Sequence, residues 1–100
     1  MPLTQQEAEE LWEKADAKVY DNNDYEGGLK DATICLQAFI ELGNKKWQGF
    51  CFSVIGEAHH RLGNYQDALT YHRKALDIAL QLCDKGGEGR TSYTLLLLYY

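Results

Sequence analysis

Two adjacent histidines, His59 and His60, and Cys51 eight residues earlier have side chains that could bind a metal or act in catalysis. The residues around them have the pattern of a helix, on which neighbours point about 100° apart. The two imidazoles therefore cannot meet at one ion in the way that ligands four residues apart do. We expect His59, with His72, to occupy a packing position and His60 to face a groove.

The run GGEGRT is the other stretch with a chemical pattern, because glycines before a threonine are typical of phosphate-binding loops. Here an arginine stands in place of the phosphate-binding lysine, and the first glycine of the pattern is missing. The sequence contains no nucleophile elbow and no zinc-protease motif. We therefore expect a protein that is not an enzyme and that uses no cofactor or metal.

The three cysteines argue against a disulfide framework or a zinc knuckle, because their number is odd and no two have C-x-x-C spacing. Cys35 and Cys83 fall on apolar helical stripes, which predicts packing thiols, while the sequence leaves the role of Cys51 open. Reduced cysteines fit a cytoplasmic location. The N-terminus shows no signal-peptide pattern.

The charge is uneven along the chain, although the total is −5. Up to Asn44 there are ten acidic and three basic residues, and from Lys45 onward five acidic and seven basic. Such a balance disfavours nucleic acid as a partner and favours basic or amphiphilic protein segments. The apolar run at 95–100 is far shorter than the roughly 20 residues of a membrane span.

The elements that would position these residues repeat with an offset of forty. The shared residues are a turn tyrosine, apolar stripe positions and linker residues. The identical pairs are Tyr25 and Tyr65, Leu29 and Leu69, Leu36 and Leu76, Leu42 and Leu82, Lys45 and Lys85, and Gly49 and Gly89.

Apolar residues at three- and four-residue steps, with capping signals between them, predict an all-α chain of five helices. Thr4 and Glu7 have the spacing of a capping box, and Gly63 followed by Asn64 predicts a tight turn between two helices. The expected helices run from Leu3 or Thr4 to Tyr20, from Asp24 to Leu42, from Lys46 to Leu62, from Tyr65 to Cys83, and from Glu88 onward.

The stretch FSVIGEAHHRLGNYQDALTYHRKALDIA resembles the tetratricopeptide repeat, in its small Gly56, in Gly63 and Tyr65 at the turn, and in Ala68 and Ala75 on the second helix. Residues 12–40 resemble a more degenerate copy. The resemblance implies a right-handed solenoid of antiparallel helix pairs in a single domain, 1–100. Its repeats would cover about 4–43, 46–83 and, in part, 88–100.

The repeat length of forty and the linker DKGGEGR resemble the Partner-of-Inscuteable type of adaptor, whose helices are longer than those of common tetratricopeptide repeats. The third copy is incomplete and ends in LLLLYY without a polar cap. Either the chain belongs to a longer array, or residues 95–100 contact a second copy of the protein.

In this family the first helix of each repeat lines a groove that binds a peptide of a protein partner. Matched by position, the expected groove residues here are Glu13, Tyr20, Phe50, Ser53, Glu57, His60, Arg61, Arg90, Tyr93 and Leu97. The lysine and asparagine clamp of chaperone-binding members is absent, since Glu13, Ala17, Val54 and Glu57 stand in its places. The resemblance thus implies a scaffold or adaptor for a cytoplasmic partner, with self-association as the alternative.

Overall fold

The computed structural model describes residues 2–82, which form four helices. These are α1 (Gln5–Tyr20), α2 (Tyr25–Leu42), α3 (Lys45–Arg61) and α4 (Tyr65–Leu82). All four expected helices in this range are confirmed, with boundaries that differ by one or two residues. The expected fifth helix, the partial third repeat, and Arg90, Tyr93 and Leu97 lie outside the described residues.

The helix starts follow from side chains that satisfy otherwise unpaired backbone N–H groups. The Thr4 hydroxyl accepts from the backbone N–H of Glu7, whose carboxylate accepts from that of Thr4, so the capping box is confirmed. Asp24 caps α2 and Asn44 caps α3 in the same manner. Because a capping residue lies outside its helix, α2 begins one residue later than expected.

The two turns inside the helix pairs share a left-handed residue two positions before the second helix. Gly63 follows α3 with φ of 86°, and Asn23, forty residues earlier, has φ of 57°. Both angles are left-handed, a conformation that glycine adopts freely and asparagine tolerates best among other residues. The structure thereby supports the forty-residue offset at a place where the two sequences differ.

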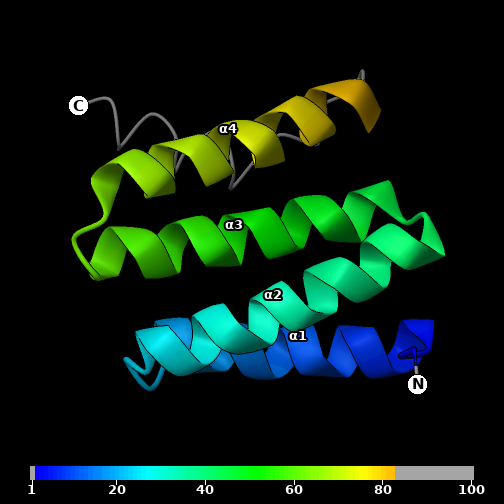
Figure 1. Cartoon of the computed structure of the whole chain (residues 1–100), viewed down its shortest axis with the longest axis horizontal. Coiled ribbons are helices and arrows are strands. Elements are labelled where there is room, and N and C mark those ends of the chain that lie inside the picture. The colour runs from blue at the N-terminus through cyan, green and yellow to red at the C-terminus, as the bar shows by residue number, and fades with distance from the viewer. Residues whose placement is uncertain (1, 83–100) are drawn as a thin grey trace.

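Each helix packs against the next one along the chain, and α1 also contacts α3 (Figure 1). The α1–α2 pair lies in the stretch expected to be repeat one, and the α3–α4 pair in the stretch expected to be repeat two. The core lies between the helices in two clusters. One is centred on Ala15, Val19, Ala32, Val54, Ile55 and Ala58, and the other on Ala8, Cys35, Ala38, Phe39 and Cys51.

The third helix, α3, contributes to both core clusters and holds five of the seven expected groove residues that lie in the described range. Because α3 contacts α1, α2 and α4, fewer of its sides face solvent than those of the other three helices. Of its residues even Gln48 and Glu57 are buried. None of the helices in the described part of the chain is long and apolar enough to span a membrane.

Candidate functional site

An aromatic cluster joins α1, α2 and α3, and we define it as Trp12, Phe39, Trp47 and Phe50. Trp47 lies at its centre, with ring centroids 5.3 Å from Phe39, 5.4 Å from Trp12 and 5.1 Å from Phe50. The Trp12 and Phe50 rings are 5.9 Å apart. These separations fall in the range of favourable aromatic pairs, so the cluster fixes the position of α1 relative to α3.

Phe50 is the exposed edge of this cluster, with 37% of its surface accessible, whereas Phe39 at the other side is fully buried. The ammonium of Lys46 lies 5.9 Å from the centre of the Phe50 ring. Trp12 adds a buried indole N–H that has no acceptor in the part of the chain that the structure describes. Phe50 is thus an accessible apolar residue held in place by edge-to-face and tilted contacts with the two tryptophans.

A second group, the polar cluster, lies toward the other end of α3 and consists of Tyr25, Glu57, His60 and Arg61. The Glu57 carboxylate accepts a hydrogen bond of 2.6 Å from Nε of Arg61 and lies 3.9 Å from Nδ1 of His60. The hydrogen bond and the charge of Glu57 raise the pKa of Arg61. An acidic side chain and a cation thus neutralise each other here.

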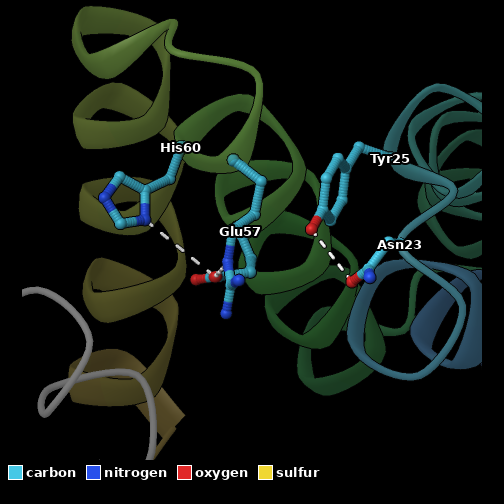
Figure 2. Close-up of polar contacts among 5 residues, drawn as sticks. Asn23, Tyr25, Glu57 and His60 are labelled. Carbon is cyan, nitrogen blue, oxygen red and sulfur yellow. Dashed lines mark hydrogen bonds and ion pairs between the residues drawn. The ribbon is translucent and has the colours of Figure 1, made fainter.

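Tyr25, at the start of α2, brings repeat one to this cluster. Its hydroxyl donates to Oδ1 of Asn23 at 3.0 Å, and Figure 2 shows Glu57 between the side chains of Tyr25 and His60. The same hydroxyl contributes to the raised pKa of Arg61. The His60 ring also contacts that of Tyr65, at 5.4 Å between centroids.

Glu57 differs from the exposed groove residue that the resemblance implies, because only 7% of its surface is accessible. A buried carboxylate needs charged or hydrogen-bonding partners, and Arg61 supplies one from the next turn of the same helix. Glu57 therefore sets the orientation of Arg61, and Arg61 is the exposed member of the pair.

The other expected groove residues in the described range are spread along α1 and α3. Glu13 is exposed, while Tyr20 and Ser53 are half-buried and each makes further contacts. Tyr20 packs against the core cluster that contains Val19 and Val54. The structure thus gathers Glu57, His60 and Arg61 and places Phe50 in a separate group.

Four residues of the two clusters are not among the expected groove residues: Trp12, Phe39, Trp47 and Tyr25. Trp47 precedes Phe50 by three residues, which puts both on one side of α3 and was a usable signal. Trp12 and Tyr25 come from another repeat. Their contacts with α3 depend on how the helices cross, and no local spacing reports that.

The histidines match packing and surface positions. His72 is buried, as expected, and His59 is half-buried with its ring stacked on Tyr71 at 5.4 Å between centroids. Within residues 2–82 there is no group of three His, Cys, Asp or Glu side chains that could hold a metal ion.

The comparisons with known proteins found a relative of part of the chain. The chain is 34% identical over 61 residues, or 59% of its length, to mouse tetratricopeptide repeat protein 28, of which it spans about 2%. No protein-family model matches the chain, and no solved structure does. The partial identity and the all-helical structure together indicate helical repeats similar to tetratricopeptide repeats.

Proposed function

We propose that this chain is a non-catalytic protein-interaction module that binds a peptide segment of a cytoplasmic partner along α1 and α3. The observation that carries the proposal is Phe50, an accessible aromatic side chain held by an edge-to-face contact with Trp47 and a tilted contact with Trp12. A rigid aromatic ring loses little conformational entropy when a partner covers it, which is why such residues dominate binding energy at interfaces.

The exposed apolar ring of Phe50 on α3 and the acidic residues of α1 together favour a partner with an apolar anchor and basic residues. Glu10 and Glu13 are exposed on α1 near Trp12 and make that helix acidic. Arg61 offers a cation at the other end of α3, with its orientation set by Glu57. An extended or helical peptide could bind its anchor at Phe50 and its basic side chains near α1.

The acidic net charge supports a protein partner rather than nucleic acid. We extend the proposal to a scaffold or adaptor of the forty-residue repeat type that resembles Partner of Inscuteable, in a right-handed solenoid. The similarity to tetratricopeptide repeat protein 28 supports the repeat class. Arg90, Tyr93 and Leu97 would extend the binding surface beyond residue 82.

A second candidate is self-association through the apolar residues 95–100. It is favoured by the exposure of Leu80 and Leu82 in the last turn of α4, which leaves apolar surface near the end of the described chain. Sedimentation equilibrium of the chain and of an L80E/L82E variant would decide. A strict monomer at high concentration would exclude this candidate.

The binding proposal is tested by selecting peptides from a random displayed library on the chain and measuring the enriched peptides by fluorescence polarisation. We expect an apolar anchor flanked by Lys or Arg, and binding that weakens as salt rises. Phe50→Ala should weaken binding by tenfold or more, on the order of a hot-spot residue. Circular dichroism of the variant reports whether its helices are intact.

The matched control is Ile34→Ala, which removes an exposed apolar side chain from α2, a different helix from that of Phe50. We expect its binding to stay within about twofold of the parent chain, as for residues outside an interface. Equal binding by the Phe50→Ala variant, with its helices intact, would overturn the proposal. So would an equal loss in the Ile34→Ala variant.

A further inference from the structure

Two buried thiols face each other where α2 packs against α3, a contact that we call the joint between the repeats. Sγ of Cys35, on α2, lies 3.3 Å from Sγ of Cys51, on α3, and neither residue exposes any surface. Cys35 also contacts the carbonyl of Ala32 at 3.3 Å. The proposed binding surface uses neither cysteine.

The two cysteines are not part of the sequence pattern that the two repeats share. At the forty-residue offset, Ala75 stands in the place of Cys35 and Leu11 in the place of Cys51. Both alternatives are apolar residues that pack in the same helix positions. The core therefore accepts residues without sulfur at these positions, and the pairing of two thiols is specific to the contact between α2 and α3.

We propose that Cys35 and Cys51 are a site of reversible oxidation, at which a disulfide covalently joins repeat one to repeat two. The two sulfurs are non-bonded neighbours on different helices. Their separation of 3.3 Å must shorten to about 2.05 Å to form a disulfide. A disulfide here would hold α2 and α3 at the joint, in the core cluster that also contains Phe39 and supports Trp47.

The oxidant that we propose is a small disulfide of the glutathione class. The thiolate of one cysteine attacks it, forms a mixed disulfide and releases one glutathione thiol. The second protein thiolate then attacks the protein sulfur of the mixed disulfide and releases the second glutathione thiol. Both protein thiol protons end on the two glutathiones, and the protein pair loses two electrons to the glutathione disulfide.

Burial controls when this reaction happens. The hydrogen bond to Cys35 and the loss of solvent raise the pKa of Cys51, so the closed structure holds little of the reactive thiolate. A glutathione molecule also has no path to sulfurs without exposed surface. The pair stays reduced while α2 and α3 are packed, and it oxidises when the joint opens.

The test uses the full chain with Cys83→Ser, so that only the proposed pair carries thiols. The protein is incubated with oxidised glutathione, without urea and at urea concentrations below the unfolding midpoint, and the products are mapped by alkylation and mass spectrometry. We expect an intramolecular disulfide between Cys35 and Cys51 that forms faster with urea and is reversed by dithiothreitol.

The disulfide closes a loop between positions 16 apart. We expect it to raise the ratio of folded to unfolded chain on the order of a hundredfold. Controls carrying Cys35→Ala or Cys51→Ala should give only a mixed disulfide with glutathione, and no such gain.

Two results would overturn the inference. One is that both thiols remain free at urea concentrations where the joint opens. The other is a disulfide that forms but lowers the helix content or the folded fraction, because such a bond would not fit the native joint. Recovery of native helix content after oxidation, with the bond mapped to this pair, supports it.

Discussion

The two helix pairs reach the same close packing with the small residue on opposite helices. In the α1–α2 pair the small residue is Gly28, on the second helix, which lies against Ala15 and Val19. In the α3–α4 pair it is Gly56, on the first helix, which lies against the ring of His72. At each contact one helix carries a glycine, and the missing side chain lets the other helix approach closely.

This difference shows what a repeat must keep and what it can exchange. At the forty-residue offset Gly28 corresponds to Ala68, and Gly56 corresponds to Asp16. The left-handed turn residue and the apolar stripe keep their positions in both repeats. The close approach between the helices requires only that one partner be small, so the two repeats place the glycine differently.

The largest effect should come from Gly28→Ala. A Cβ there would lie 2.4 Å from Cγ2 of Val19 and 3.0 Å from the backbone oxygen of Ala15. The oxygen belongs to the backbone of α1, and the methyl group to a β-branched side chain that is stiff about its Cα–Cβ bond. Overpacking costs about 1 to 3 kcal/mol, and alanine returns up to about 1 kcal/mol in helix propensity. We expect a net loss of about 2 kcal/mol in the free energy of unfolding, measured with urea.

The control for this variant is Glu26→Ala, in the exposed first turn of the same helix. Its stability should stay within about 0.5 kcal/mol of the parent chain. If Gly28→Ala were as stable as this control, the α1–α2 contact would not depend on the missing side chain.

The number of helices in residues 2–82, and nearly all of their ends, could be predicted from the sequence because they rest on local signals. Capping residues, a turn glycine and a period of three to four residues each act within one turn of chain. The placement of the glycine on the second helix in one pair (Gly28) and on the first helix in the other (Gly56) could not be predicted. It depends on which helix of the pair carries the large residue at the crossing point.

Gly56→Ala should have a smaller effect than Gly28→Ala. The added Cβ would lie 2.8 Å from Nε2 of His72, whose ring is buried but belongs to a side chain that can rotate. We expect a net loss of about 1 kcal/mol in the free energy of unfolding.

A double-mutant cycle with His72→Ala isolates this contact. Without the ring, Gly56→Ala should become neutral or stabilising, because only the gain in helix propensity remains. The same cost in both backgrounds would show that Gly56 is needed for another reason than its contact with His72.

The candidate site was predictable only in part for a related reason. Phe50, His60 and Arg61 are on the exposed side of α3 in their helical positions, which local periodicity reports. The burial of Glu57 depends on neighbours from other parts of the chain and on its pairing with Arg61. A residue that a helical wheel places on the surface can thus be buried by the helices around it.

The smallest of the three effects should be a pH dependence confined to the α3–α4 pair. Neither ring nitrogen of His72 has a hydrogen-bond partner within residues 2–82, and burial lowers its pKa below 6.5. The charge of His60 lowers it further, while that of Glu57 acts in the opposite direction. In repeat one the corresponding residue is the buried Ala32, which does not titrate.

The direction in which stability changes with pH follows from whether the folded or the unfolded chain binds the proton. Below about pH 6.5 the unfolded chain protonates this histidine while the folded chain resists, so unfolding takes up a proton and acid favours it. The contribution of His72 is present above pH 6.5 and is lost as the pH falls through its lowered folded pKa. The slope cannot exceed about 1.4 kcal/mol per pH unit, the limit for one proton.

Urea unfolding of the parent chain and of His72→Leu from pH 7.5 to pH 5 measures this contribution as the difference between two curves. His59 and His60 are present in both proteins, so the difference between the two curves reports on His72. We expect the parent chain to lose stability more steeply with acid than the His72→Leu variant. Parallel curves would show that His72 accepts a proton in the folded chain, which requires a partner for its ring. That result would remove the contrast between the two helix pairs.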